Sequence, residues 1–133
     1  DAARTGTRVA HALLAGPPGL TVWHGETTVR LCASPGQGGR NRHLALAAAR
    51  VLDGHPHTAL LTLATDGEDH AGAAGAWADG ATMARGRESG LDADAALAGC
   101  DSGAYFAALG QALAVRATAG NVRDLVLGWR APS

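Results

Sequence analysis

The chain has 133 residues, the length of a single domain, and a formal net charge of −1, which supplies no global field to attract nucleic acid or an anionic membrane. Every apolar run is well short of the roughly 18 residues that a membrane-spanning helix needs, so a transmembrane segment is excluded. All eleven basic residues are arginines, so this chain offers no lysine for a phosphate clamp or a Schiff base.

The two cysteines, Cys32 and Cys100, form no CxxC motif. We favour the interpretation that both are buried thiols in a cytoplasmic protein. A disulfide between them stays open as the alternative. The first residue is Asp1 rather than Met, and the sequence shows no signal peptide. We therefore expect a cytoplasmic location and a piece of a longer protein.

The first element in chain order is a predicted helix over residues 2–15, which ends at Gly16-Pro17-Pro18. We assign residues 1–19 to this helix and to a linker from an upstream domain, and residues 20–133 to one further domain. Residues 20–23 and 28–33 have the apolar pattern of strands, and Gly25-Glu26 between them is suited to a hairpin turn.

The rest of the chain alternates between predicted helices and strands. Residues 58–64 form a short apolar run suited to a central strand with both faces covered. The expected helices cover residues 41–52, 73–89, 92–98 and a segment capped by Ser102, and the last strand covers residues 122–129. This alternation predicts a single α/β domain with a mixed, mostly parallel sheet flanked by helices.

The glycine-rich loop of residues 36–41 runs straight into a predicted helix. Free backbone N–H groups and the positive end of the helix dipole favour an anion there, and Arg40 adds a two-pronged charged contact. The loop is neither a Walker A sequence nor a GxGxxG fingerprint. A plain turn stays open as the alternative.

A second loop, residues 65–69, follows the most apolar strand and carries the acids Asp66, Glu68 and Asp69. In open α/β sheets ligands bind at the carboxyl ends of strands, where acids hold a metal, orient a hydroxyl or accept its proton. The alternative is a solvated turn. Residues 118–121 form a small polar loop that is most simply a turn, and the histidines lack the spacing typical of a zinc site.

Several short motifs follow one another in a specific order. The stretches are GETTV at residues 25–29, GGRN at 38–41, TDG at 65–67 with Asp69, AAG at 73–75, Asp101-Ser102 with Phe106, and Thr118, Asn121, Val122 and Asp124. In order and spacing they resemble the MOFRL family, the C-terminal domain of bacterial-type glycerate kinases. The resemblance covers about residues 20–130.

The departures from the family pattern cluster in loops. His24, His70, Arg116 and Ala119 stand where the family has glycine, Arg42 and His43 replace Gln and Glu, and Ala117 replaces a proline. A larger side chain in place of glycine narrows the space for a phosphate or a close backbone approach. The departures therefore predict a diverged member whose activity has weakened or moved.

The resemblance implies phosphorylation of D-glycerate, or a similar small hydroxy acid, to 2-phosphoglycerate with ATP and Mg²⁺. It also implies an N-terminal nucleotide-binding-type domain, missing from this chain, which supplies a lysine and the other wall of an interdomain cleft. The implied catalytic residues are Asp66, which orients or deprotonates the hydroxyl, and Arg40, which binds the carboxylate or a phosphate. The implied binding residues are Glu26, Gly38, Gly39, Asn41, Thr65, Gly67, Thr118 and Asn121, with Asp69 as a metal ligand.

Two further hypotheses stay open. The first is a standalone binding or assembly module that kept the fold and lost catalysis, which the missing glycines and the missing partner domain favour. The second is a reductase, because family members are also named hydroxypyruvate reductases, although the chain has no dinucleotide fingerprint. A homodimer stays open as well, and no nucleic acid or membrane partner is expected.

Overall fold

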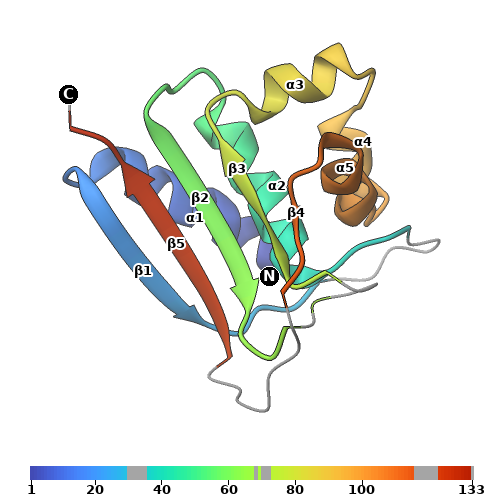
Figure 1. The fold of residues 1–133 in the computed structure, drawn as a ribbon, viewed down its shortest axis with the longest axis horizontal. Coiled ribbons are helices and arrows are strands. Elements are labelled where there is room, and N and C mark those ends of the chain that lie inside the picture. Colours follow the sequence, from blue (N-terminus) through green and yellow to red (C-terminus); the bar gives the residue numbers. More distant parts are fainter. Residues whose placement is uncertain (30–35, 68, 70–72, 116–122, 133) are drawn as a thin grey trace.

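A five-stranded sheet with helices packed against one of its faces makes up the fold of the computed structural model (Figure 1). The structure describes residues 1–29, 36–67, 69, 73–115 and 123–132. The strands are β1 (Gly19–Gly25), β2 (Thr58–Ala64), β3 (Gly75–Asp79), β4 (Ala112–Leu113) and β5 (Asp124–Arg130). In the view of Figure 1, α1 (Ala2–Ala15) and α2 (Arg40–Leu52) lie behind the sheet.

The strands lie in the order β1-β5-β2-β3-β4, and every neighbouring pair is antiparallel. The α/β class and the single domain are confirmed, but the mostly parallel sheet is wrong. The last strand, β5, is inserted between β1 and β2, and β2 occupies the centre of the sheet as expected.

The error in sheet direction comes from residues 73–89, which were expected to form one helix. They form strand β3 followed by helix α3 (Thr82–Glu88). Ala76 and Ala78 are fully buried while Trp77 between them is exposed, which is the period-two pattern of a strand. Because β3 returns directly beside β2, no helical crossover separates the two, and parallel pairing needs such a crossover.

The first two helices in chain order were predicted well. Helix α1 begins after Asp1, whose carboxylate accepts a hydrogen bond from Arg4 N at 3.0 Å. Helix α2 begins one residue before its expected start and ends at Leu52 as expected. The two helices pack so closely at Gly6 that a Cβ atom there would lie 2.2 Å from the carbonyl oxygen of Leu44. Val9, Ala10 and Leu13 of α1 belong to the same hydrophobic core as α2.

Two short helices, α4 (Ala93–Ala98) and α5 (Ser102–Leu109), cover the far end of α2 together with α3. The Asp92 carboxylate caps α4 by accepting from Ala95 N at 3.1 Å, as predicted. Ser102 is the first residue of α5 rather than its cap, so that prediction is wrong by one residue.

Two other expectations need correction. Residues 26–29 are not in a strand, and β1 pairs with β5, so no hairpin turns at Gly25-Glu26; residues 30–35 lie outside the described part. Cys100 is buried and is not a free thiol, which contradicts the expected pair of thiols. Among the described residues no helix combines the length and the apolar character needed to cross a membrane.

Candidate functional site

An ion pair between the first residue of α2 and the first residue of β5 forms the centre of the candidate site. Arg40 Nε donates to Asp124 Oδ2 at 2.6 Å, and Arg40 Nη2 donates to Asp124 Oδ1 at 2.8 Å. This hydrogen-bonded pairing raises the pKa of Arg40, partial burial opposes the rise, and the charges of Asp124, Asp69 and Glu26 reinforce it. The guanidinium therefore stays charged and is held in one plane by Asp124.

A second carboxylate, that of Asp69, lies at the N-terminus of α2. It accepts from the backbone N–H groups of Asn41 at 3.1 Å and Arg42 at 3.3 Å, and from the side chains of the same two residues at 3.3 and 3.4 Å. Its side chain is fully buried, and Oδ1 lies 4.0 Å from Arg40 Nη1. An internal carboxylate thus occupies the helix N-terminus at which the sequence predicted an external anion.

Gly39 allows this arrangement. Its φ is 119°, and a Cβ atom at this position would lie 2.3 Å from Asp69 Oδ2. A side chain would therefore be strained and would also displace the carboxylate. Gly38 packs against another part of the chain, since a Cβ atom there would lie 3.1 Å from the carbonyl oxygen of Cys100.

The turn after β2 approaches the same place from the centre of the sheet. Thr65 donates to the carbonyl oxygen of Arg123 from its backbone N–H at 3.2 Å and from its hydroxyl at 2.6 Å. Gly67 N donates to Ala64 O at 2.9 Å, which closes a tight turn around the half-buried Asp66. Arg123 has a φ of 71°, which is uncommon for a residue other than glycine.

A cavity of about 420 Å³ opens beside the ion pair, within the usual size range for small-molecule sites. Glu26, Asn41 and Asp124 contribute polar groups to its wall, and Thr5 and Arg8 of α1 contribute others. The remaining wall is mostly apolar, formed by Val9, Ala12, Trp23, Leu44 and Val126 together with residues 24, 25 and 27.

The structure therefore brings together Glu26, Arg40, Asn41 and Asp69, and places Thr65 and Gly67 beside them. Thr118 and Asn121 lie outside the described residues. Asp124 was not among the predicted site residues, although it matches the last motif of the resemblance, and Arg8 gave no sequence signal at all. The described residues contain no group of three His, Cys, Asp or Glu side chains that would hold a metal ion.

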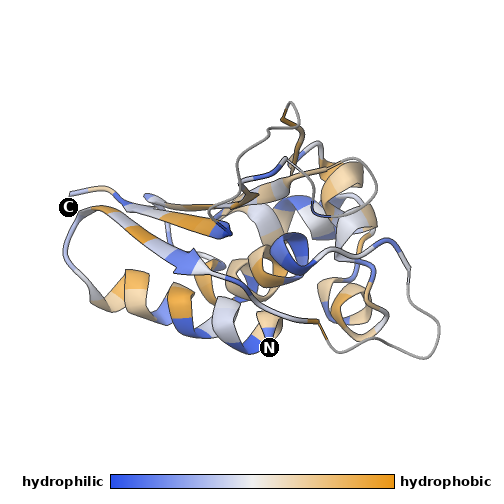
Figure 2. Ribbon diagram, turned by 90° about the horizontal axis from the view of Figure 1, so that it is seen from below, coloured by the Kyte–Doolittle hydropathy of each residue, from blue (hydrophilic) through white to orange (hydrophobic). Residues whose placement is uncertain are grey.

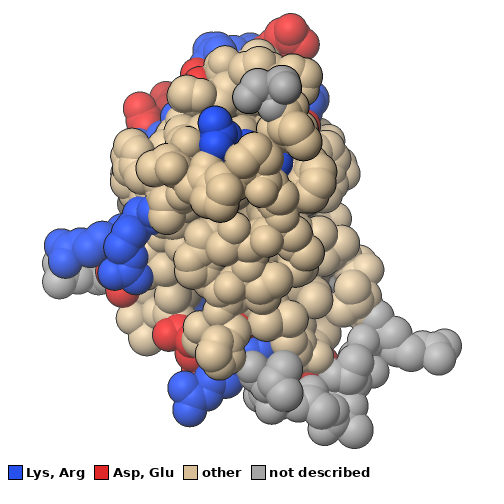
Figure 3. Space-filling view, turned by 90° about the vertical axis from the view of Figure 1, so that its left-hand side faces the viewer, with Lys and Arg blue, Asp and Glu red and all other residues tan. Residues whose placement is uncertain are grey.

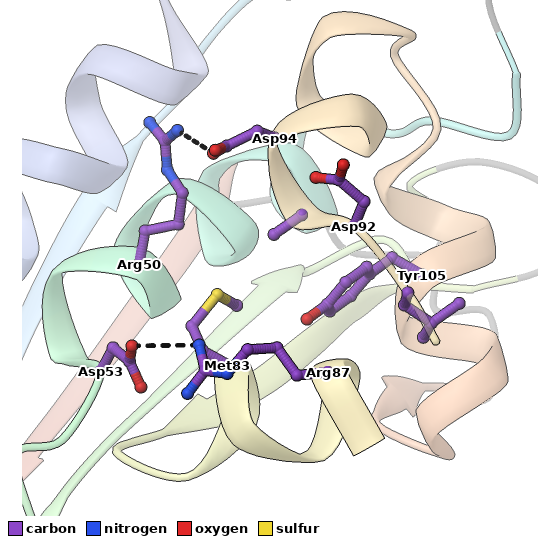
Figure 4. Close-up of a pocket in the computed structure, with 9 residues that line it drawn as sticks. Arg50, Asp53, Met83, Arg87, Asp92, Asp94 and Tyr105 are labelled. Atoms are coloured by element: carbon purple, nitrogen blue, oxygen red, sulfur yellow. Dashed lines mark hydrogen bonds and ion pairs between the residues drawn. The ribbon is translucent and has the colours of Figure 1, made fainter. Parts of the chain in front are cut away.

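Another cavity, of about 460 Å³, lies at the far end of α2 and contains none of the predicted site residues (Figure 4). Two ion pairs cross its rim, Arg50–Asp94 at 2.6 Å and Arg87–Asp53 at 3.3 Å. Tyr105 points into it, and burial raises the pKa of its hydroxyl. These charges are already paired with each other, so the cavity shows no preference for a ligand of one sign.

The family comparison covers both the fold and the site. The model of the MOFRL family matches residues 19–124, so the chain belongs to the MOFRL family. The matched stretch contains Arg40, Asp69 and Asp124, whereas α1 and its Arg8 precede it.

The relatives are longer proteins. Glycerate 2-kinase of Pyrococcus horikoshii is 34% identical over 112 residues, which are 84% of this chain and 25% of that protein. D-glycerate 2-kinase of Thermotoga maritima is 37% identical over 84% of this chain and 27% of its own length, and a putative hydroxypyruvate reductase of Agrobacterium vitis is 38% identical over 81% and 29%. The chain corresponds to the C-terminal portion of these relatives.

Solved structures show the same fold. The crystal structure of glycerate kinase from Thermotoga maritima superposes with a TM-score of 0.93 at 31% identity, covering 98% of this chain and 34% of that one. A protein from Pyrococcus horikoshii gives a TM-score of 0.94 at 28% identity, covering 100% of this chain and 32% of its own. Helix α1 is therefore part of the shared fold, although it precedes the residues that the family model matches.

Proposed function

We propose that this chain is the C-terminal part of a glycerate kinase that phosphorylates D-glycerate to 2-phosphoglycerate with ATP and Mg²⁺. One observation carries the proposal: the Arg40–Asp124 pair, Asp69 and the turn at residue 66 meet at one end of the sheet, in a domain that matches glycerate 2-kinases. Phosphoryl transfer depends mainly on positioning and on neutralising charge, which a fixed arginine supplies.

Arg40 is the proposed contact for the substrate carboxylate or a phosphate. Asp124 holds the Nε and Nη2 edge of its guanidinium, so an anion reaches Arg40 from the Nη1 side. The side chain is 26% exposed, which leaves room for that approach. Glu26 and Asn41 line the neighbouring cavity and are proposed to contact the rest of the acid.

Asp66 is proposed to orient the attacking hydroxyl or to accept its proton. It lies in the turn directly after the central strand β2, and Thr65 ties this turn to the residue preceding Asp124. A carboxylate so placed can act as a general base once a substrate is held within hydrogen-bond distance.

The described carboxylates do not fit a Mg²⁺ site built by this chain alone. Asp124 is paired with Arg40, and the fully buried Asp69 accepts from four donors, so the proposed role of Asp69 as a metal ligand would require it to give up such bonds. We therefore derive no step through the metal. In the proposed enzyme the nucleotide and its Mg²⁺ are held mainly by the other domain.

A diverged binding or assembly module without catalysis is the second candidate. The observation that favours it is internal pairing: the carboxylates of Asp69 and Asp124 take up the N-terminus of α2 and two donors of Arg40. In such a module these contacts would stabilise the fold and bind no substrate.

A coupled assay for 2-phosphoglycerate separates the two candidates. The complete product of the gene that encodes this chain is supplied with ATP, Mg²⁺ and D-glycerate, and the Arg40→Ala variant is measured beside it. Turnover of about 1 per second or more that is lost in the variant supports the kinase. A folded product without turnover would favour the module and refute the kinase.

A further inference from the structure

The face of the sheet that turns away from α1 and α2 is apolar across four strands. The register places Val22 opposite Leu127, Leu127 opposite Leu61 and Leu61 opposite Trp77, so these four side chains form one row across the sheet. Leu20 and Trp129 face each other in the next row. We call these six residues the open face: Leu20, Val22, Leu61, Trp77, Leu127 and Trp129.

Several of these side chains are exposed to solvent. Leu20 is 61% exposed, Val22 53%, Trp129 46% and Trp77 37%. Figure 1 looks onto the open face with α1 and α2 behind it, and Figure 2 shows apolar strands above α1 with no described helix on their upper side. An antiparallel sheet with one face in water normally carries polar side chains on that face, so this composition indicates a surface that is covered in the working protein.

Charge is nearly absent from the open face. By strand alternation the ionisable side chains on this side of the described strands are His24 and Asp79, at opposite corners, and Asp79 is paired with Arg85 at 2.6 Å. Figure 3 views the molecule from the side of β1, so the open face is seen edge-on, and the middle of the surface in that view carries no charged group. A matching surface is therefore apolar and uncharged, which excludes a nucleic acid or a charged peptide.

The size of the open face distinguishes between occupants. Four strands about 4.8 Å apart and roughly six residues at 3.3 Å each span about 20 by 20 Å, or roughly 400 Å² on each partner. The total of about 800 Å² lies within the range of about 600–1,500 Å² for contacts between domains of one chain. It falls below the roughly 1,200 Å² of a stable complex of separate proteins, which disfavours a second copy.

We propose that the open face is the docking surface for a further domain of the same polypeptide, which contacts it through an uncharged apolar surface. This rests on the proposed function in one respect, namely the two-domain organisation. The matched relatives are long enough to contain such a domain. The solved structures cover 98% and 100% of this chain, whereas this chain covers 25–34% of the relatives.

The open face and the candidate site lie on opposite sides of the sheet. Trp23 and Val126 line the cavity and alternate with Val22 and Leu127 of the open face, so they lie on the side of α1 and α2. The two surfaces come near each other at the end of the sheet where Gly25 pairs with Asp124. A domain seated on the open face would therefore reach Arg40 and Asp124 by extending around that end of the sheet.

The test compares the 133-residue chain with the complete product of its gene. Val22→Lys and Trp129→Lys each place a charge on the open face, and Val115→Lys is the control because Val115 is 41% exposed and lies outside the sheet. The readouts are the melting temperature, the accessibility of tryptophan fluorescence to acrylamide, and the mass in sedimentation.

We expect both face variants to leave the melting temperature of the 133-residue chain within about 3 °C, because the side chains are already in water. In the complete product the same variants should lower it by about 10 °C or more, while Val115→Lys leaves it unchanged in both. Acrylamide should quench tryptophan emission less in the complete product than in the chain.

Three results would overturn the proposal: face variants that are harmless in the complete product, a complete product no longer than this chain, or dimers of the chain that Val22→Lys dissociates. The last would assign the face to a second copy. Kinase activity is not a readout here. A complete product without turnover that still loses stability on Val22→Lys would refute the proposed function and leave this inference standing.

Discussion

At the scale of single residues, Arg40 uses its planar fork on Asp124 rather than on a ligand. Lysine cannot reproduce two parallel hydrogen bonds, so we expect Arg40→Lys to lose both the position of the cation and its anion contact. The loss of one charged hydrogen bond, about 1.5–3 kcal/mol, corresponds to roughly ten- to a hundredfold weaker binding. Titration of phosphate and of glycerate against both proteins measures this.

Arg50→Lys is the control for that experiment, because Arg50 pairs with Asp94 at the far end of α2 and at higher exposure. Its anion affinity should equal that of the unmodified chain. Equal affinities for Arg40→Lys and the unmodified chain would remove Arg40 from the site.

A buried histidine gives the chain a dependence on pH. His43 is 8% exposed, its Nδ1 has no hydrogen-bond partner in the described structure, and burial lowers its pKa. The unfolded chain then takes up the proton more readily than the folded chain does. The folded chain therefore keeps its full stability above about pH 6.5, the ordinary pKa of histidine in the unfolded chain. It loses stability as pH falls through and below that value, because protonation of His43 favours the unfolded chain.

We expect the melting temperature to fall between pH 7.5 and 5.5, and to fall less in His43→Gln. The exposed His11 supplies the control, because His11→Gln should keep the full pH dependence of the unmodified chain. Melting curves recorded by circular dichroism at several pH values decide this. An identical pH dependence in His43→Gln would show that His43 is not the group responsible.

Asp66 is expected to act in the reaction more than in folding. Asp66→Asn should leave the melting temperature within a few degrees, since changes in a turn usually cost within about 0.5 kcal/mol. In the complete enzyme it should lower turnover on the order of a hundredfold, as expected for the loss of a catalytic base. A large loss of stability with unchanged turnover would make Asp66 a structural turn residue.

At the scale of elements, the N-terminus of α2 depends on a carboxylate from another part of the chain. Asp69 accepts from the backbone of Asn41 and Arg42, so Asp69→Asn should cost about 1.5–3 kcal/mol for the lost charged hydrogen bonds. Chemical denaturation measures the free energy of unfolding. Asp92→Asn is the control, because asparagine caps a helix about as well as aspartate, and it should change little. Equal effects would show that Asp69 is no more than an ordinary cap.

The sequence predicted those elements whose pattern is local. Helix α2 and strand β2 were placed within one residue because a helical stripe and an apolar run are both readable from neighbours. Strand β3 was missed because its buried positions, such as Ala76 and Ala78, are alanines, which also suit a helix. What made them a strand is the space beside β2, which is tertiary information.

The candidate site shows the same division. The loops of Arg40 and Asp66 were identified from motif order, and they lie near each other in the structure. The pairing of Arg40 with Asp124 joins residues 84 positions apart, and no local pattern carries that information. Asp69 was expected to bind a metal, and only the geometry shows that it faces the N–H groups of α2.

At the scale of the whole molecule, we expect the 133-residue chain to fold alone and to leave ATP and glycerate unreacted. One continuous core joins α1, α2, α5 and the sheet, so folding needs no partner. Catalysis needs a closed cleft with little water, and a single domain supplies one wall of it. The coupled assay for 2-phosphoglycerate on the purified chain tests this. Turnover near 1 per second would show that the site is complete without another domain.

The place of β5 between β1 and β2 also sets the order of events during synthesis. Helix α1 and strands β1 to β3 leave the ribosome before β5, so β1 has no partner strand among the described residues until residues 124–130 have followed. The most central contacts are thus among the most distant in sequence, which is typical of slowly folding chains. Until then the apolar residues of β1 and β2 stay available to chaperones, and a chain stalled before residue 124 would present them to proteases.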